Sequence, residues 1–475
     1  MSHSVPTAHG RRKRRAKRPH TRSEAMNLTA SRLSARADRR NRRTTRRGLL
    51  KAAVAAAAAP YFVPRSVLGG PGKTAAGDRI GVGCIGTGSR GTAVLRSILP
   101  FKEARVVAVC DVFADRRNRA RGLAGRHYGT KAGRRGCEAV GDFRELLARD
   151  DVDAVTIVVQ DHWHAPIAVA AAKAGKDIYC EKPLGVSVAG SRAIRDAVGK
   201  YGCAFQTGTQ QRSARTFRHA CELARNGYLG TVHTVVVGAP GPSYRPGYRG
   251  PTSPQPVPAG LDFDMFLGPA PKKPYNPGRH AWPDWYLIWD YCAGFIVNSG
   301  VHHLDIACWG CPDLASKPFE LTCKGSYRKE GLTDNINDWQ GRFVYPGGLR
   351  MTFTDTGHPN AQGCKFVGDK GWVHVNRRGI RAEPASLLTV ALKPGDLRLH
   401  RSSHHQGDFL KAVKTRRKTV SPVQAGHDAS CLGLLAEIAC RLRRKLTWDP
   451  EAGKFTGDDE ANRLLARPMR APWTL

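Results

Sequence analysis

Short apolar runs alternate with amphipathic stretches between residues 78 and 208, and this alternation constrains the fold more than any other feature of the chain. Continuous apolar runs are typical of strands that are buried on both faces of a parallel sheet. The intervening stretches have helical spacing, and Gly175 stands where one such helix should end. The runs comprise residues 79–85, 104–110, 153–159, 176–180 and 203–208. Repeated strand–helix units predict an α/β domain with a doubly wound parallel sheet for residues 78–207.

The alternation then stops, and residues 208–475 are expected to form a second domain. Residues 240–283 are rich in Pro and Gly and long for a loop, so we expect them to be functional or wrapped over the body. Residues 341–354, GRFVYPGGLRMTFT, predict a hairpin with its turn at Tyr-Pro-Gly-Gly. Helices are expected near residues 406–417 and 426–444. Strands in runs, followed by helices, predict an α+β arrangement.

Residues 1–77 differ from the rest in charge and are predicted to be a leader. They hold 19 Lys and Arg residues against 2 acidic residues, whereas the other 398 residues carry 57 against 37. Arg46 and Arg47, followed by Leu49, Leu50, Lys51 and a short Ala run, match a twin-arginine export signal. We therefore expect the chain to use the twin-arginine export machinery and to be periplasmic.

The leader also gives expectations about the native start of the chain, about a membrane span and about nucleic-acid binding. Met26 lies where a signal of ordinary length begins, so we expect the native start there. The Ala-rich core is too short for a firm anchor, and no apolar run reaches the 18 residues of a bilayer span, so no stable membrane span is expected. The basic run at residues 11–18 could bind nucleic acid, but it lies within or before the export signal, so no nucleic-acid partner is expected.

Composition is that of an ordinary globular protein. The 475 residues are enough for two or three domains, and 41% hydrophobic with 24% charged residues exclude a wholly disordered or fibrous chain. The thirteen cysteines are scattered, several within the apolar runs, and are expected to be mostly free core thiols. Cys308 and Cys311 lack a second pair that would complete a zinc site. No metal is expected; a site built from His302, His303 and Asp305 is the weaker alternative to ordinary structural hydrogen bonding.

A glycine-rich turn follows the first apolar run directly and opens a helix. Its GxGxxG pattern comprises Gly86, Gly88, Ser89, Arg90 and Gly91. The first glycine permits a tight turn, the second lets the backbone approach a pyrophosphate, and the third lets helix and strand pack closely. Asp111 ends the second run 20 residues after Gly91, the spacing for binding a ribose 2′-hydroxyl. A dinucleotide-binding Rossmann domain is therefore predicted, with NAD favoured by the acidic residue and NADP compatible with the nearby Arg116 and Arg117.

Two polar blocks follow later apolar runs, at the sheet edge where ligands bind in doubly wound folds. The blocks are Gln160-Asp161-His162-Trp163-His164 and Glu181-Lys182-Pro183. Taken singly, Lys182 could be a solvated surface charge and His164 a cap at a helix start. Their joint placement beside the glycine turn favours a shared site, in which the Lys182 ammonium could bond a substrate hydroxyl and the nicotinamide ribose.

These motifs, with AGKDIYCEKPL, GTQQRS, GLDFDMFLGPAP and DDEANRLLARPMRAPW, resemble the Gfo/Idh/MocA (glucose–fructose oxidoreductase / inositol dehydrogenase) family, in its exported bacterial branch. The resemblance covers residues 78–475. It implies a Rossmann domain and an α/β domain whose open, mostly antiparallel sheet often mediates oligomers, so a homo-oligomer is expected. It also implies that Lys182 lies at the reaction centre. Further contacts are expected to the cofactor from Asp161, His164 and Glu181, and to the substrate from Gln210, Arg212 and His303.

The family's second signature is a Gly-rich turn, then Asp, then a His four residues later that acts as acid/base on the sugar hydroxyl. Here His302 matches the histidine, but Asn298 occupies the aspartate position. Asn can still orient a hydroxyl, but it has no charge that would raise the pKa of His302 or share its proton. The two residues are one helical turn apart. The expected catalytic residues are Lys182, His302 and Asn298, with catalysis altered or weakened by the Asn.

The resemblance thus implies hydride transfer from a sugar, glycoside or cyclitol to a nicotinamide, with His302 removing the hydroxyl proton and Lys182 holding the oxygen. Because free cofactor is not expected outside the cytoplasm, the folded protein should carry its cofactor through export and recycle it in place. Two alternatives stay open. One is a redox-neutral NAD-dependent glycoside hydrolase or lyase of the same family, working by oxidation, elimination and reduction. The other is a sugar-binding homologue with weakened turnover, for which Asn298 argues.

Overall fold

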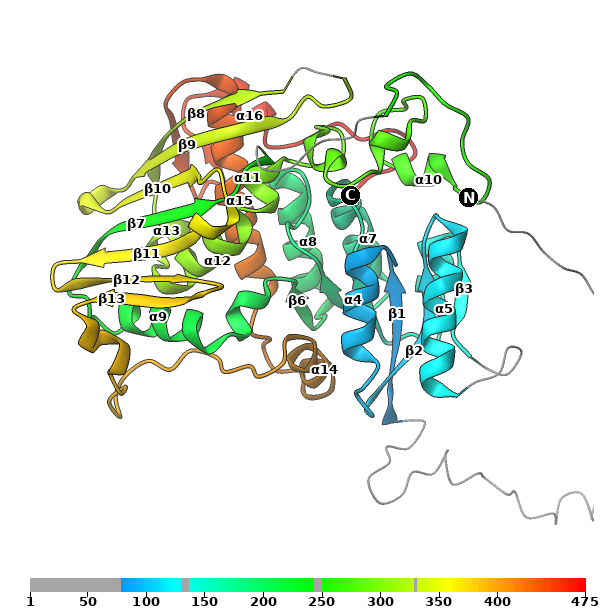
Figure 1. The fold of residues 1–475 in the computed structure, drawn as a ribbon, viewed down its shortest axis with the longest axis horizontal. Coiled ribbons are helices and arrows are strands. Elements are labelled where there is room, and N and C mark those ends of the chain that lie inside the picture. The colour runs from blue at the N-terminus through cyan, green and yellow to red at the C-terminus, as the bar shows by residue number, and fades with distance from the viewer. Residues whose placement is uncertain (1–77, 130–135, 243–249, 329–330) are drawn as a thin grey trace, which may run out of the picture. The chain divides into compact units, whose positions relative to one another are not determined.

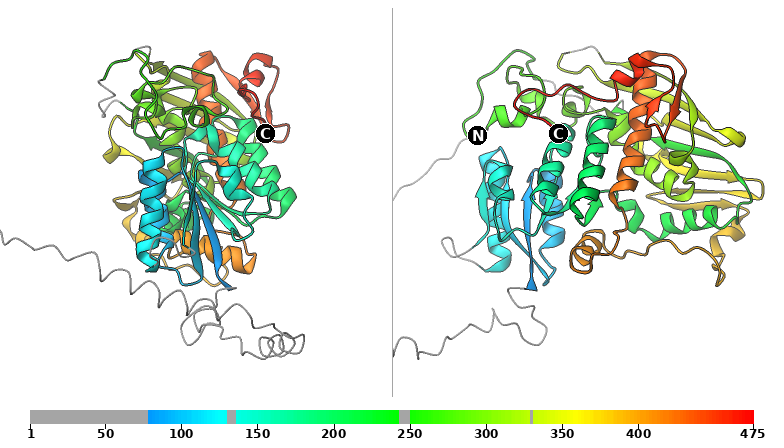
Figure 2. Two further views of the ribbon diagram at one scale, coloured as in Figure 1. Left: turned by 90° about the vertical axis from the view of Figure 1, so that its right-hand side faces the viewer. Right: turned by 180° about the vertical axis from the view of Figure 1, so that it is seen from behind.

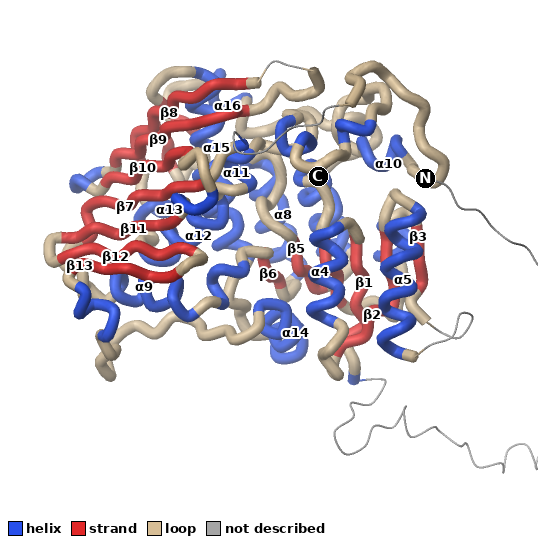
Figure 3. The backbone as a smooth tube through the Cα atoms, in the orientation of Figure 1, coloured by secondary structure: helices blue, strands red, loops and turns tan. Residues whose placement is uncertain are grey.

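The computed structural model describes residues 78–129, 136–242, 250–328 and 331–475, and the predicted leader, residues 1–77, lies outside them. The strands of the described part form two separate sheets, with helices packed against each (Figure 3). Among these residues, no helix is both long and apolar enough to cross a bilayer. All thirteen cysteines lie in the described part and are free thiols, as the sequence predicted.

The first sheet has six parallel strands in the order β3-β2-β1-β4-β5-β6 (Figure 1). Its order reverses beside β1, and every residue of β1 is buried, as expected for a central strand of a doubly wound sheet. The strands are β1 (Ile80–Ile85), β2 (Ala104–Cys110), β3 (Glu138–Val140), β4 (Ala154–Ile157), β5 (Asp177–Cys180) and β6 (Phe205–Thr207). The helices are α4 (Ser89–Ile98), α5 (Ala114–Tyr128), α6 (Phe143–Leu147), α7 (Asp161–Lys173) and α8 (Val188–Tyr201).

One strand of this sheet was not predicted. β3 has three residues at the edge of the sheet, and its side chains are only partly covered, so it has no apolar run to mark it. Five of the six strands correspond to the predicted apolar runs. Gly175, expected to end a helix, directly follows the last turn of α7 with φ +70°.

The second sheet has nine strands in the order β13-β12-β11-β7-β10-β9-β8-β14-β15. Neighbours are antiparallel except β7 and β10, which are parallel. The strands are β7 (Val232–Ala239), β8 (Phe319–Tyr327), β9 (Ile336–Val344), β10 (Arg350–Asp355), β11 (Gly363–Gly368), β12 (Gly371–Asn376), β13 (Gly379–Glu383), β14 (Leu446–Asp449) and β15 (Lys454–Phe455). The predicted hairpin is β9–β10, in which Val344 pairs with Arg350. The predicted fold class is confirmed: a doubly wound parallel sheet followed by an open, mostly antiparallel one.

Helices cover one face of the second sheet. The alternation of buried and exposed residues along β8 shows that its other face is turned outward. The long helix α15 (Val423–Leu442), orange in the view from behind in Figure 2, packs on α12 (Val301–Gly310) and β8 of this layer and also on α8 of the first. Other helices of this region are α9 (Arg215–Arg225), α11 (Phe295–Asn298), α13 (Asp313–Ser316) and α16 (Asp459–Arg463).

Three segments of the second region return to the first sheet. Helix α14 (His405–Thr415) packs on α4, with Phe409 and Leu410 in the core of the first sheet. The described part of the Pro/Gly-rich stretch carries the short helix α10 (Phe263–Leu267), whose backbone accepts a hydrogen bond from Trp163 of α7. Near the C-terminus, the Trp473 ring lies 4.7 Å from the Trp163 ring, centroid to centroid. The expectation that residues 240–283 wrap over the body therefore matches their described part.

The turn between β1 and α4 is the tightest connection in the first sheet. Gly86 has φ +83°, and a Cβ there would lie 2.1 Å from the backbone oxygen of Val158. A Cβ on Gly91 would lie 2.0 Å from the backbone oxygen of Gly86. Only glycine allows this approach of the helix to its strand. Gly88 is different, because its backbone is ordinary (φ −61°) and the space beside it is open.

We predict that Gly91→Ala lowers the free energy of unfolding by about 1–3 kcal/mol, because the new methyl group must push α4 away from β1. Gly88→Ala is the matched control. The atom nearest its Cβ is Nη1 of Arg116, at 3.8 Å, and its free energy of unfolding should change by less than about 1 kcal/mol. Urea titrations followed by circular dichroism measure both values. A Gly91→Ala protein as stable as the wild type would contradict this account of the turn.

Candidate functional site

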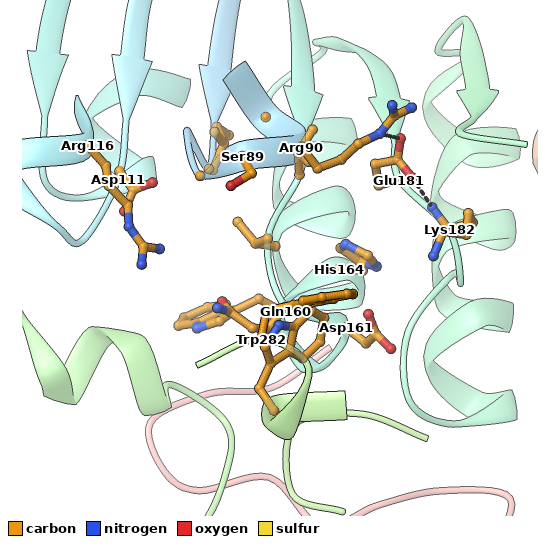
Figure 4. Close-up of a pocket in the computed structure, with 18 of the residues that line it drawn as sticks. Ser89, Arg90, Asp111, Arg116, Gln160, Asp161, His164, Glu181, Lys182 and Trp282 are labelled. Atoms are coloured by element: carbon orange, nitrogen blue, oxygen red, sulfur yellow. Dashed lines mark hydrogen bonds and ion pairs between the residues drawn. The ribbon is translucent and has the colours of Figure 1, made fainter. Parts of the chain in front are cut away.

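The carboxyl ends of β1, β2, β4 and β5 border a cavity of about 1250 Å³. This is the edge at which doubly wound sheets bind ligands. Figure 4 shows Asp111 and Arg116 at one end of the cavity and Glu181 and Lys182 at the other. The second region closes the cavity with side chains from η2 (Gln210–Ser213), α9, α10, η5 (Asp284–Leu287) and α12. The site is therefore shared between the two sheets.

Asp111 is tied to the glycine turn at one end of the cavity. Its Oδ2 accepts hydrogen bonds from the Thr87 backbone N–H (2.7 Å) and hydroxyl (3.1 Å), and its Oδ1 accepts from the Phe113 backbone N–H (3.0 Å). A carboxylate has about four acceptor positions, so one remains for a ligand hydroxyl. The Arg116 guanidinium stacks 3.7 Å over the Phe113 ring and lines the cavity, whereas Arg117 donates to the Asp111 backbone oxygen at 3.0 Å.

Glu181 accepts several hydrogen bonds that hold the loop carrying Lys182 in place. Its side chain is 5% exposed, and Oε1 accepts from Arg90 Nε at 2.8 Å and from Gln210 Nε2 at 3.0 Å. Oε2 accepts from the Lys182 backbone N–H at 3.3 Å. Gln210 also donates to the Tyr179 hydroxyl at 2.8 Å. The predicted residues Arg90, Glu181 and Gln210 thus meet in one network, which fixes the start of the Lys182 loop to α4 and η2.

Lys182 reaches across to the second region. Its ammonium donates to the backbone oxygen of Asn298 at 3.1 Å and to the side-chain oxygen of the same residue. The Asn298 amide nitrogen donates to Asp161 Oδ2 at 2.7 Å, and the Cys292 thiol donates to the same oxygen at 3.0 Å. The predicted residues Lys182, Asn298 and Asp161 therefore form a chain in which the amide lies between the two charged groups.

Burial and neighbouring charges act in opposite directions on this chain. Burial lowers the pKa of Lys182, while the carboxylates of Glu181 and Asp161 raise it. Burial raises the pKa of Asp161, while His164 and Lys182 lower it. The ammonium and the Asp161 carboxylate each favour the charged form of the other.

Two histidines line the cavity, and each has one buried ring nitrogen that is unpaired among the described residues. His164 Nδ1 donates to the Pro183 carbonyl at 2.7 Å, which leaves Nε2 unprotonated. Among the described residues, neither His164 Nε2 nor His302 Nδ1 has a hydrogen-bond partner, and both residues line the cavity. Burial lowers the pKa of both rings, and the Lys182 ammonium lowers that of His302 further. Both imidazoles are therefore neutral near pH 7, with a nitrogen free to accept a proton or hydrogen bond.

Two predicted substrate residues do not reach the cavity. Arg212 is buried in an ion pair with Asp305, with Nε 2.8 Å from Oδ2, and its guanidinium lies 4.9 Å from the Trp309 ring centroid. His303 is fully buried and does not line the cavity; its Nε2 lies 3.0 Å from Gln362 and its Nδ1 3.4 Å from Gln211. Both residues hold α12 in place instead. Among the described residues, no three His, Cys, Asp or Glu side chains are grouped so that they could hold a metal ion, and Asp305 and His303 bond these separate partners.

Several cavity residues were not predicted. Gln211 donates to the His302 backbone oxygen at 3.0 Å and accepts from Arg377 Nε at 3.1 Å, and Arg377 lines the cavity from the turn after β12. No local signal marks Arg377. Trp282, Trp285 and Tyr286 also line the cavity, and Trp282 is 55% exposed. Their clustering at the end of the Pro/Gly-rich stretch was a signal that could have found them.

Gln160, Asp161, His164 and Trp282 all line the cavity, and Figure 4 draws them between its two ends. His162, by contrast, turns away and bonds the backbone oxygens of Phe266 and Tyr291. The arrangement is an elongated cavity with an acceptor and an arginine at one end. At the other end are an ammonium and a neutral imidazole, and three aromatic residues, of which Trp282 is exposed, also line the cavity. Such a site can hold a dinucleotide and a polar substrate side by side and move a proton between substrate and histidine.

Comparisons with known proteins agree with this geometry. A glycosyl hydrolase family 109 protein of Saccharopolyspora erythraea is 37% identical over 111 residues, which are 23% of this chain and 24% of the relative. A myo-inositol 2-dehydrogenase of Thermotoga maritima is 28% identical over 187 residues, 39% of this chain and 49% of the relative. The chain thus matches a quarter to a half of the length of these relatives.

A solved aldose–aldose oxidoreductase of Caulobacter crescentus, complexed with glycerol, has the same fold. Its TM-score is 0.58 at 18% identity, over 78% of this chain and 100% of the other. Residues 80–209 match the model of an oxidoreductase family described as an NAD-binding Rossmann fold, which confirms the predicted NAD-binding domain. Residues 215–475 match the C-terminal alpha/beta domain of the same family. The chain therefore belongs to the Gfo/Idh/MocA oxidoreductase family.

Proposed function

We propose that this protein is an NAD-dependent oxidoreductase that removes a hydride from the carbon of a sugar, glycoside or cyclitol hydroxyl and keeps its cofactor bound. The observation that carries the proposal is the meeting of the Lys182 ammonium and the neutral His302 imidazole in a cavity that continues to the glycine turn. The names of the relatives, a myo-inositol dehydrogenase and an aldose–aldose oxidoreductase, support a polyhydroxylated substrate.

The residues at the glycine turn fit a dinucleotide. The space beside Gly88 is open, so a pyrophosphate can approach the backbone at the N-terminus of α4. Asp111 keeps an acceptor position for a ribose hydroxyl, which favours NAD, while Arg116 in the same lining is compatible with NADP. When bound, NAD supplies a nicotinamide ring that accepts hydride.

Lys182 and His302 have different roles at the substrate hydroxyl: the first donates a hydrogen bond to it and the second accepts its proton. An ammonium has three N–H donors, and Lys182 uses two of them on Asn298, which leaves one for the substrate oxygen. The neutral His302 ring accepts the hydroxyl proton as the carbon loses hydride. Gln211 donates to the backbone oxygen of His302 and so helps to hold the ring at the cavity.

The aromatic residues define the kind of substrate. Trp282, Trp285 and Tyr286 give flat, partly apolar surfaces beside polar groups, a combination suited to the two faces of a sugar or cyclitol ring. Burial raises the pKa of Tyr286 well above its ordinary value, so its hydroxyl stays protonated and able to donate. We therefore place the substrate between these rings and Lys182.

A redox-neutral glycoside hydrolase or lyase is the second candidate. The 37% identity to a family 109 glycosyl hydrolase over 111 residues favours it, although the match covers a quarter of that relative. Such chemistry returns the hydride to the same substrate and so suits a retained cofactor. A weakened sugar-binding homologue is the third candidate, and its support is the neutral Asn298.

We also propose that the chain is exported in folded form by the twin-arginine pathway to the periplasm. The support is the Arg46-Arg47 pair with its leucines and Ala run. The thirteen free thiols suit a protein that folds in a reducing compartment.

Protein purified without added nucleotide should release about one NAD(H) per chain on denaturation, because the cofactor is carried and recycled in place. Incubation with sugars and with nitrophenyl glycosides then separates the candidates. Sugar oxidation reduces bound NAD and raises absorbance at 340 nm, whereas redox-neutral hydrolysis releases nitrophenol and returns the bound cofactor to its starting oxidation state. A purified chain free of nucleotide that needs millimolar NAD would contradict a retained cofactor.

The activity should extend to acidic pH. His302 accepts a proton only when neutral, and burial with the nearby ammonium keeps its pKa well below the ordinary 6.5. Activity should therefore fall only when the pH drops through this lowered pKa, so kcat/KM measured against pH should keep its plateau at pH 6. His302→Asn should lower kcat by about 10²–10⁴-fold. An acidic limb centred above pH 6.5 would speak against His302 as the base.

Export is tested in the full-length chain by changing Arg46 and Arg47 to Lys. The wild-type chain should be found in the periplasmic fraction of a bacterial host, and the double Lys variant in the cytoplasm. Changing the upstream pair Arg42 and Arg43 to Lys is the matched control and should leave export intact. Export of the Arg46/Arg47 variant at the wild-type level would refute the signal.

A further inference from the structure

A neutral amide lies between the partly buried Lys182 ammonium and the buried Asp161 carboxylate. The ammonium donates to the side-chain oxygen of Asn298, and the Asn298 nitrogen donates to Asp161 Oδ2 at 2.7 Å. Asp161 is 1% exposed and Asn298 is 2% exposed. A buried charge without a partner is strongly unfavourable, so the amide bridge helps to stabilise the Asp161 carboxylate.

The two charges fix the orientation of the amide. An ammonium only donates and a carboxylate only accepts, whereas an amide has one accepting and one donating end. A flipped Asn298 would place its NH₂ against the ammonium and its oxygen against the carboxylate. In the observed orientation the amide oxygen faces the Lys182 ammonium and the amide nitrogen faces the Asp161 carboxylate. The carboxylate therefore helps to keep the accepting end of the amide directed at the ammonium.

Burial raises the pKa of Asp161, and two features of its surroundings act against that rise. Asp161 is the first residue of α7, where the helix N-terminus favours negative charge. The Cys292 thiol donates to the same carboxylate oxygen at 3.0 Å as the Asn298 amide does. The Asn298 side chain contacts Lys182, Asp161 and Cys292. The Asp161 carboxylate is therefore separated from the ammonium by one residue, Asn298, which bonds to both.

We propose that Asp161 is a positioning residue for Lys182: acting through Asn298, its carboxylate keeps the lysine protonated and directed at the substrate oxygen. This inference rests on the proposed function. In this proposal Asn298 links the two charged groups, and its presence does not indicate that the site has lost activity. The role goes beyond holding cofactor, because it links a residue of α7 to the reacting hydroxyl through two hydrogen bonds.

Other titratable groups also face the ammonium, and they set the background for a pH test. They are Glu181 on the same loop, Arg90 on α4, His164 on α7, Cys292 before α11 and His302 on α12. None of these is changed in the variants below. A difference in pH behaviour between variants therefore reports the Asp161–Asn298 pair.

Exchanging the two side chains is the decisive test. Asn298→Asp places two carboxylates in hydrogen-bond contact, and such a pair holds a shared proton. Asp161→Asn leaves two amides and removes the charge, so Asn298 loses its fixed direction. The double variant Asp161→Asn/Asn298→Asp restores one carboxylate and one amide, with the carboxylate now accepting from Lys182 directly and from Asn at 161.

In sugar oxidation, each single variant should lose at least about 10-fold in kcat/KM, and the double variant should recover most of that loss, as expected for strongly coupled neighbours. The alkaline limb of the pH profile gives a second readout. Without the Asp161 carboxylate, Lys182 loses its proton at lower pH, so the limb of Asp161→Asn should move to lower pH. In the double variant it should return to the wild-type position or higher.

Unfolding measurements give a readout that does not need turnover. In Asn298→Asp the paired carboxylates have a raised pKa in the folded state, so the variant loses stability as the pH rises through that pKa. Its melting temperature should therefore fall further below the wild type at pH 8 than at pH 5. The double variant should remove this extra loss.

Asn335→Asp is the matched control, because Asn335 is a fully buried amide outside the cavity that donates to the Cys292 backbone oxygen at 2.8 Å. Adding Asp161→Asn to it should give no recovery. Additive single effects in unfolding and in kinetics, or an alkaline limb that does not move in Asp161→Asn, would overturn the inference. If the unfolding data show coupling but no sugar is oxidised by any variant, the proposed function fails while the charge link stands.

Discussion

The hydrogen bond from the Lys182 ammonium to Asn298 is the interaction on which the site depends. Lys182 belongs to a loop after β5 of the first sheet, and Asn298 ends α11 beside the second. This contact joins the two sides of the cavity. The glycine turn and the acidic acceptor lie on one side, and the imidazole and the aromatic rings lie on the other. The helix α15, packed on α8 and α12, keeps the two sheets at the distance this bond requires.

Sequence reasoning placed the first sheet and its glycine turn well, because buried parallel strands are continuous apolar runs and glycine patterns report local backbone needs. It missed β3, which is short and partly exposed. It also expected Arg212 and His303 at the substrate, since a charged or titratable residue near a motif does not show which face of its element it occupies. The ion pair of Arg212 with Asp305 and the contribution of Arg377 arise from tertiary contacts between distant segments, and local patterns carry no such information.

Asn298 is expected from the sequence to alter or weaken catalysis, and that expectation stays a prediction. From the sequence it is a family aspartate without its charge. In the structure a carboxylate lies 2.7 Å from its amide nitrogen, contributed by Asp161 from a different helix. The number of charges at the site is thus set by residues from several helices and cannot be counted from one motif. A second carboxylate at position 298 would add a charge beside an existing one rather than restore a missing one.

The closure of the cavity bears on how firmly a ligand is held. Met265 and Phe266 of α10 line it, and the Trp163 indole donates to the Met265 backbone oxygen at 3.0 Å. Arg470, near the C-terminus, donates to the Gly268 backbone oxygen at 2.9 Å and pairs with Asp264. This wall of the cavity is therefore held by several contacts between segments that lie far apart in the sequence. A wall held in this way is consistent with the retained cofactor that we propose.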